Sequence, residues 1–333
     1  MQNKRMLILG ATGQIGKELS LELKNFKDFN IISHCRTLVS ASFFKHNGME
    51  YIVGDLNDKN IISEIFNSDL IFDLAAPNSG SLKEIKNFYK DRLDLIFGNM
   101  KKNSKFIFAS SMNAFGIDEK RKILKNYFFS SSIYASNKRY AEKYIKKLGK
   151  HNSISTYILR LGEVHGFYQR SSIEIIKLIN EGYVFEIPNT PAWITFVSLI
   201  KSSIINILNN QEKPGLYTLV CDDIYWEDLL NLLSKKNKIV PKFIIKKKEK
   251  KFSIIYKSFY RFLMSKKDSI RGNVSINKNF EDLMKLNFRI NKVKSSNEKF
   301  KGVKIYNKKN RYIGILPGKR LKSLKYKIND VLN

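Results

Sequence analysis

Short apolar runs alternate with amphipathic stretches along most of this 333-residue chain. A short continuous apolar run is typical of a buried strand, whereas apolar positions that recur every three or four residues are typical of a helix. The pattern predicts helices from about residue 14, over 82–102 and over 133–149. It predicts strands over 4–10, 29–36, 49–56, 69–77, 104–111, 155–162 and 215–220, and a strand followed by a helix within 191–208.

Strands that are separated by helices pair in parallel, because each connection has to return to the starting edge of the sheet. We therefore expect the α/β class, with a Rossmann-type doubly wound parallel sheet and a smaller, mixed C-terminal lobe. After residue 166 the pattern is weaker, and from 221 onward it indicates short helices, basic connectors and weak strands.

Three glycines, Gly10, Gly13 and Gly16, mark the point where the first predicted strand turns into the first predicted helix. Glycine allows the tight turn, leaves room for a pyrophosphate and lets the helix approach the strand closely. The free N–H groups at the start of the helix attract an anion. We therefore expect a dinucleotide-binding domain over residues 1–165, to which 191–220 returns, and a substrate-binding lobe over 166–190 and 221–333.

The residues at the end of the second predicted strand bear on the choice of cofactor. An acidic side chain there accepts a hydrogen bond from the ribose 2′-hydroxyl of NAD and repels the 2′-phosphate of NADP. This chain has no acid within 33–37, and Arg36 offers a fork of donors that suits a phosphate. We expect NADP to be preferred over NAD; the alternative is that Arg36 only points into solvent.

Several motifs within residues 1–220 resemble those of the extended short-chain dehydrogenases/reductases, also called the NAD-dependent epimerase/dehydratase family. They are GATGQIG (10–16), GDL (54–56), DLAAP (73–77), IFASSMNAFG (107–116), YASNKRYAE (134–142) and ILRLGEVHG (158–166), in the order and spacing of that family. The resemblance implies that the cofactor is bound by the glycine loop, by the ends of the second and fourth strands and by an adenine-contacting turn. These residues are Gly10, Thr12, Gly13, Gln14, Ile15, Gly16, Arg36, Asp55, Leu56, Ala75 and Ala76, together with Tyr134 and Lys138.

The same resemblance implies a catalytic group formed by Ser111, Tyr134 and Lys138. A free tyrosine, with a pKa of about 10, is a poor base at neutral pH, and a nearby ammonium lowers that pKa. We expect Tyr134 to be the general acid/base of a hydride transfer, and Lys138 to lower its pKa and bind the nicotinamide ribose. Ser111 is expected to anchor the substrate oxygen, with the neighbouring Ser110 as the alternative.

The family acts mostly on nucleotide-activated sugars. The resemblance therefore implies an NAD(P)-dependent reductase or epimerase that acts on a keto or hydroxyl group of a sugar, for surface polysaccharide synthesis. The alternatives are a 4-epimerase that keeps NAD tightly bound and a non-catalytic NADP-binding regulator. Dehydration is disfavoured, because Ser111, Met112 and Asn113 replace the Thr-Asp-Glu of the dehydratases. Glu163 also stands where many members have an asparagine that contacts the substrate phosphate, and WITFVSL (193–199) lacks the family's arginine and aspartates.

The chain carries 60 basic and 30 acidic residues, for a net charge of +30. Such a charge suits nucleic acid or an anionic membrane, but no further motif indicates nucleic acid. Within 243–267 lysines mix with apolar residues, which is consistent with a helix on anionic lipid or with a surface helix of the lobe.

The remaining expectations concern location, metals and assembly. No apolar stretch reaches the roughly 18 residues of a membrane span, and two cysteines, Cys35 and Cys221, form no disulfide framework. We therefore expect a cytoplasmic protein. The histidines lack the spacing of a metal site, so no metal is expected; for His165, a substrate contact and polar packing are both open. By resemblance, a homodimer forms through helices of the first domain.

Overall fold

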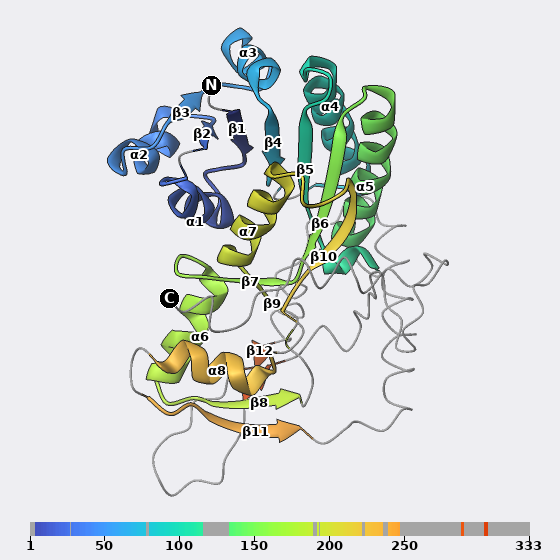
Figure 1. Cartoon of the computed structure of the whole chain (residues 1–333). Coiled ribbons are helices and arrows are strands. Elements are labelled where there is room, and N and C mark those ends of the chain that lie inside the picture. Colours follow the sequence, from blue (N-terminus) through green and yellow to red (C-terminus); the bar gives the residue numbers. More distant parts are fainter. Residues whose placement is uncertain are drawn as a thin grey trace, which may run out of the picture.

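A computed structural model describes residues 4–26, 28–77, 80–115, 133–188, 192, 194–221, 224–235 and 239–246, and two short strands at 288–289 and 303–305. Its largest element is a seven-stranded sheet in which every pair of neighbours is parallel (Figure 1). The strand order is β10-β6-β5-β4-β1-β2-β3. The strands are β1 (Lys4–Leu9), β2 (Phe29–Cys35), β3 (Tyr51–Val53), β4 (Leu70–Asp73), β5 (Lys105–Ser111), β6 (Ser155–Leu161) and β10 (Gly215–Leu219).

The strands β1 and β4 are neighbours in the sheet but not in sequence. From β1 the strands β2 and β3 follow towards one side of the sheet, whereas β4, β5, β6 and β10 follow towards the other. Open α/β sheets bind ligands at such a switch point, in the crevice beyond the carboxyl ends of the strands. The predicted doubly wound parallel sheet is confirmed.

Helices cover both faces of the sheet. One face packs against α1 (Gln14–Leu23), α2 (Leu38–His46) and α7 (Val197–Leu208), and the other against α3 (Lys59–Asn67), α4 (Leu82–Asn99) and α5 (Ile133–His151). In β1, Met6 and Ile8 belong to the first hydrophobic cluster, and Leu7 and Leu9 belong to the second. All four side chains are fully buried, as in parallel sheets covered on both sides.

A smaller mixed sheet with the order β11-β8-β13-β12 lies beyond the carboxyl edge of the large one (Figure 1). Its strands are β8 (Val184–Pro188), β11 (Lys242–Lys246), β12 (Phe288–Arg289) and β13 (Val303–Ile305), and only β12 and β13 pair in antiparallel fashion. Helices α6 (Arg170–Asn180) and α8 (Trp226–Ser234) pack together there. Strands β7 (Glu163–His165) and β9 (Ile194–Phe196) form a two-stranded sheet. The expected smaller, mixed lobe is thus present.

Several predicted boundaries were too long. The strand expected over 49–56 is only β3, and the strand over 69–77 ends at Asp73. The third strand stops early because the N–H of Asp55 turns to the Asp58 carboxylate at 2.8 Å. Helix α4 ends at Asn99 rather than at 102. The first helix, predicted from about residue 14, is α1, and Phe26 beyond its end stacks on Phe29.

The pattern did not single out α2, α3 or α6. Helix α2 shows why, because its first two residues, Leu38 and Val39, are 75% and 84% exposed. Apolar residues on the outer side hide the helical period. The start of the helix is fixed by a capping box, in which Thr37 and Ser40 each bond to the other's main chain.

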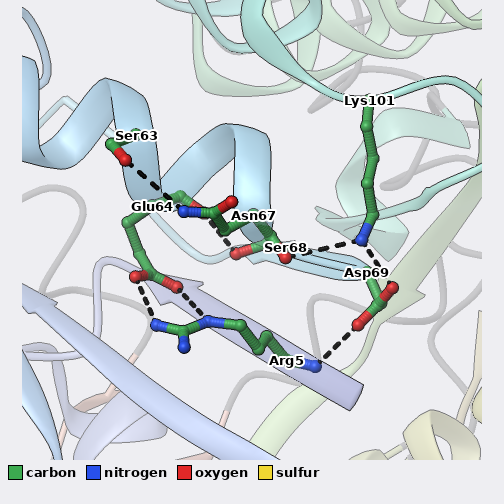
Figure 2. A network of polar contacts seen from close by, with 7 residues as sticks. All are labelled: Arg5, Ser63, Glu64, Asn67, Ser68, Asp69 and Lys101. Atoms are coloured by element: carbon green, nitrogen blue, oxygen red, sulfur yellow. Dashed lines mark hydrogen bonds and ion pairs between the residues drawn. The ribbon is translucent and has the colours of Figure 1, made fainter. Parts of the chain in front are cut away.

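Charged residues join the amino ends of the strands (Figure 2). Arg5 forms two hydrogen bonds to the Glu64 carboxylate, at 2.7 and 3.1 Å, and its main-chain N–H donates to Asp69. Lys101 donates to the other oxygen of Asp69 at 2.7 Å. This network lies at the edge opposite to the glycine loop, so it contributes to the fold and offers control positions for experiments on the site.

No helix in the described part of the chain is long and apolar enough to cross a membrane. The predicted membrane-surface segment 243–267 lies outside the described residues from position 247 onward.

Candidate functional site

The glycine loop connects β1 to α1, and the need for glycine differs among its three positions. Gly10 has a φ of +76°, and a Cβ there would lie 2.7 Å from the main-chain nitrogen of Ala75. A Cβ on Gly16 would lie 2.5 Å from the oxygen of Ala11. At Gly13 a Cβ would meet only the oxygen of Gly10, at 3.3 Å. Gly10 and Gly16 are therefore required by close packing, whereas a Cβ on Gly13 would make one tight contact, with a main-chain oxygen.

Gly13 is the N-cap residue of α1. Gly13 and Gln14 are exposed, and Thr12 and Ile15 are half-buried. No side chain of the described residues caps the helix, and its first turn holds no acid. The uncapped N–H groups and the positive end of the helix dipole fit an anionic pyrophosphate. This part of the structure therefore fits the predicted dinucleotide.

The loop after β4 lies against the glycine loop, with Ala75 half-buried and Ala76 exposed. Asp73, the last residue of β4, is fully buried and accepts a hydrogen bond from the N–H of Ala75 at 3.0 Å. Its two oxygens also accept from Arg92 of α4, at 2.7 and 3.3 Å. This ion pair fixes the start of the loop. Sequence reasoning missed it, although an aspartate inside an apolar strand has to find a partner.

The residues predicted near the adenosine lie at the carboxyl ends of β2 and β3, which are paired. Arg36 follows β2 directly and is exposed. After β3, Asp55 is exposed and its carboxylate accepts from the N–H and the side-chain amide of Asn57, at 3.3 and 3.2 Å, while Leu56 is half-buried. His34 joins the two strand ends, because its Nε2 lies 3.0 Å from the oxygen of Gly54.

The structure brings the three predicted catalytic residues together. Ser111 is the last residue of β5, and Tyr134 and Lys138 lie one turn apart at the start of α5. The side chains of Ser111 and Tyr134 are joined by a hydrogen bond. Lys138 Nζ donates to the main-chain oxygen of Ala109 at 2.7 Å and lies 5.8 Å from the centre of the Tyr134 ring.

The surroundings of these side chains shift their proton affinities. Burial lowers the pKa of Lys138 to about 8, although the Asp73 and Glu142 carboxylates act to raise it. The expected lowering of the Tyr134 pKa by Lys138 is not found: burial raises that pKa, and the hydrogen bond from Ser111 opposes the rise. Tyr134 is nevertheless 47% exposed, so its phenol is accessible to a ligand while surrounded by protein on its other sides.

Ser110 is engaged elsewhere. Its buried hydroxyl donates to the Glu142 carboxylate at 2.6 Å. The same carboxylate accepts from Arg160 of β6 at 2.6 and 2.8 Å. The structure therefore favours Ser111 over Ser110 as the partner of Tyr134, and it adds a buried ion pair, Glu142–Arg160, that sequence reasoning missed.

The other residues considered as substrate contacts, nucleophiles or metal ligands do not lie in positions that suit those roles. His165 is fully buried, with Nδ1 3.0 Å from the hydroxyl of Ser172, which indicates polar packing rather than a substrate contact. Cys35 and Cys221 are buried free thiols, and burial raises the pKa of Cys35 to about 11. Among the described residues, no three His, Cys, Asp or Glu side chains are grouped as metal ligands. Residues 116–132, between Phe115 and α5, are outside the description, as are the side chains of Asn113 and Phe115.

Sequence comparison places these observations in a family. The NAD dependent epimerase/dehydratase family matches residues 6–183. The chain belongs to this family. The resemblance carried by the motifs is thereby confirmed, and the chain is an enzyme of the extended short-chain dehydrogenase/reductase type that uses a nicotinamide cofactor. No curated protein matches the sequence significantly.

Solved structures share the fold at low sequence identity. The UDP-N-acetylglucosamine 4-epimerase from Bacillus cereus has a TM-score of 0.58 at 16% identity, over 75% of this chain and 87% of its own. The UDP-glucuronic acid 4-epimerase from Bacillus cereus, in complex with NAD, has a TM-score of 0.55 at 16% identity, over 73% and 85%. MoeE5, in complex with UDP-glucuronic acid and NAD, has a TM-score of 0.52 at 19% identity, over 73% and 85%.

Proposed function

We propose that the protein is an NAD(P)-dependent reductase or epimerase that acts on a keto or hydroxyl group of a nucleotide-linked sugar, with Ser111, Tyr134 and Lys138 as its catalytic residues. The observation that carries this proposal is the meeting of these three side chains at the carboxyl edge of the sheet. Asp73 connects them to the cofactor loop, because its charge acts on Lys138 while it bonds to Ala75 beside Gly10.

A bound nicotinamide supplies or accepts the hydride. The oxygen of the substrate gains negative charge as its carbon is reduced, and Tyr134 is suited to protonate it. The phenol of Tyr134, whose pKa is raised above the ordinary tyrosine value, is protonated at neutral pH, which is the state that an acid requires. Ser111, hydrogen-bonded to the same phenol, is placed to donate to that oxygen and hold it in reach.

In the opposite direction Tyr134 has to remove a proton from a hydroxyl group. A charged Lys138 favours the phenolate, because opposite charges at short range stabilise each other. One N–H of Lys138 is used by the oxygen of Ala109. An ammonium has three donors, so the remaining N–H groups are available to a ribose hydroxyl in this proposal.

We further propose a preference for NADP. The exposed Arg36 directly after β2, the absence of an acid within 33–37 and the N-terminus of α2 close behind support a site for a 2′-phosphate. The alternative is a 4-epimerase that retains NAD.

A nucleotide sugar as substrate is supported by family membership and by the ligands named for similar structures, UDP-glucuronic acid and UDP-glucose. The proposed substrate lobe is 166–190 with 221–333, while 1–165 and 191–220 hold the cofactor. The place of β10 in the large sheet and of β8 and β11 in the small one supports that division. The half-buried Glu163 at the start of β7 disfavours a diphosphate directly beside it. Dimerisation and a role in surface polysaccharide synthesis stay predictions.

The first experiment is to denature the purified protein and identify any released nucleotide by mass spectrometry. Retained NAD(H) would support an epimerase that recycles its cofactor and would contradict the NADP preference. An empty protein that binds NADPH in a fluorescence titration supports a reductase, to be assayed with keto-sugar nucleotides.

A Tyr134→Phe variant separates catalysis from binding. We expect it to bind the cofactor as the wild type does while turnover falls by about 10²-fold or more. Tyr144→Phe, also on α5 but hydrogen-bonded to Asp94, is the matched control. Binding without turnover of any sugar nucleotide, in wild type and control alike, would instead support the non-catalytic regulator.

A further inference from the structure

Glu18 is a buried carboxylate on α1, one turn after the glycine loop. It accepts hydrogen bonds from the main-chain N–H groups of Phe167 and Tyr168, at 2.7 and 3.0 Å. The side-chain amide of Gln169 donates to it at 2.6 Å. All of these donors lie in the segment between β7 and α6, far away in sequence. A single side chain of the cofactor helix therefore holds the turn that leads into α6.

The Glu18 carboxylate lies so close to Gly166 that no side chain fits at this position. A Cβ on Gly166 would lie 2.1 Å from Glu18 Oε1 and 2.7 Å from its Oε2 and Cδ. Gly166 is not among the glycines with positive φ. Its φ therefore does not require glycine, and the nearest obstacle to a side chain at this position is Glu18.

Two further hydrogen bonds extend the contact to the first residue of α1. The amide of Gln169, which is buried, also donates to the main-chain oxygen of Gln14 at 3.2 Å. The N–H of Arg170, the first residue of α6, donates to the side-chain oxygen of Gln14 at 3.4 Å. Gln14 follows Gly13 at the open end of the helix, so the same segment bears on the shape of the anion-binding turn.

We propose that Glu18 is a positioning residue that fastens segment 166–170 to α1 and thereby sets the affinity of the glycine loop for the dinucleotide. The inference rests on the proposed function, since it takes the start of α1 as the pyrophosphate site. Glu18 does not touch the cofactor in this proposal. It acts through Gln169 and Gln14. The conformation of the glycine loop then depends on the position of α6, which lies beside the smaller sheet.

The test is Glu18→Gln, which keeps the size of the side chain. An amide offers one acceptor oxygen, whereas Phe167 and Tyr168 donate to different oxygens of Glu18, so one N–H would face an NH₂ group. We expect the Kd for NADPH, measured by fluorescence titration well below the unfolding temperature, to rise by about fivefold or more, as for modest coupling between sites. Glu22→Gln is the control, because Glu22 lies one turn further along α1 and pairs with Lys201 at 3.1 Å. An unchanged Kd in Glu18→Gln would overturn the proposal, even if the variant were less stable.

A double-mutant cycle tests the contact without a cofactor. Gly166→Ala should lower the unfolding temperature strongly in the wild type and much less in the Glu18→Ala background, where the carboxylate is gone. Equal losses in both backgrounds would contradict the contact on which the proposal depends. If the wild type binds neither NADPH nor NADH, the proposed function fails and with it the role of Glu18 in affinity, whereas the cycle would still show whether Glu18 and Gly166 are coupled.

Discussion

The side chain of Lys138 reaches from α5 to the main-chain oxygen of Ala109 in β5, where the two atoms lie 2.7 Å apart. This bond fixes the start of α5 to the carboxyl end of the strand that also carries Ser111. The Lys138 side chain is buried, and its Nζ lies 4.6 Å from the centre of the Phe108 ring. Burial accounts for the lowered pKa of this lysine, because it removes water from the ammonium, whereas the Asp73 and Glu142 carboxylates act in the opposite direction.

The pKa of Lys138, lowered to about 8, predicts a pH dependence of stability. Between pH 8 and the ordinary lysine pKa of about 10.4, the unfolded chain binds more protons at this position than the folded chain. The free energy of unfolding should therefore gain a contribution that rises with pH across this window. Below pH 8 both states are protonated, and the contribution is constant.

Urea unfolding at pH 7, 8, 9 and 10 measures this dependence. The Lys138→Met variant should lack the rise, so the difference between wild type and variant should change across the window. Lys146→Met, at an exposed position on the same helix, should run parallel to the wild type. A constant difference between wild type and Lys138→Met would show that the lysine titrates normally.

The two neighbouring serines should separate catalysis from stability. Ser111→Ala removes the partner of Tyr134 and should lower kcat, with little change in the free energy of unfolding. Ser110→Ala removes a donor from the buried Glu142 carboxylate and should lower stability by about 1–3 kcal/mol. Steady-state kinetics and urea unfolding of both variants give the answer, and a reversed pattern would assign the anchoring role to Ser110.

Removal of Arg92 should be strongly destabilising. Asp73 is fully buried, and Arg92→Met would leave it without its ion-pair partner, at a cost of about 3–5 kcal/mol in the free energy of unfolding. Lys101→Met breaks a more exposed pair with Asp69 and should cost about 1 kcal/mol or less. Adding Asp73→Asn to Arg92→Met should restore part of the lost free energy of unfolding. If the double variant loses as much as the two single variants added together, the unpaired charge is not the cause.

Arg36 should discriminate between the two cofactors. Arg36→Ala should raise the Kd for NADPH about tenfold or more, in line with lost hydrogen bonds to a charged group, and should leave the Kd for NADH nearly unchanged. Lys45→Ala, in the last turn of α2, is the control for general loss of positive charge. Equal weakening of both cofactors, or a preference for NADH in the wild type, would remove the basis for the NADP assignment.

Much of the fold, and the placement of the candidate site residues on it, followed from local spacing. The glycines at 10, 13 and 16 lie at a strand-to-helix turn, and Tyr134 and Lys138 lie one helical turn apart, because short-range geometry dictates both. Apolar runs found the strands of the large sheet, since a parallel sheet buries both faces. Strand ends were placed less well, because an apolar run can continue into a loop, as after Asp73.

Contacts between distant segments could be known only from the folded chain. The pair Asp73–Arg92 is 19 residues apart, Ser110–Glu142 is 32 apart, and Glu18–Phe167 is 149 apart. No periodicity encodes such pairs, because their partners are set by how helices and strands pack. That packing placed Ser111 beside Tyr134 and Ser110 beside Glu142, gave Lys138 its lowered pKa and joined α1 to the turn before α6. The residue types and their local order came from the sequence, whereas the partners of the buried charges came from the fold, since burial obliges each charge to meet whatever the packing brings to it.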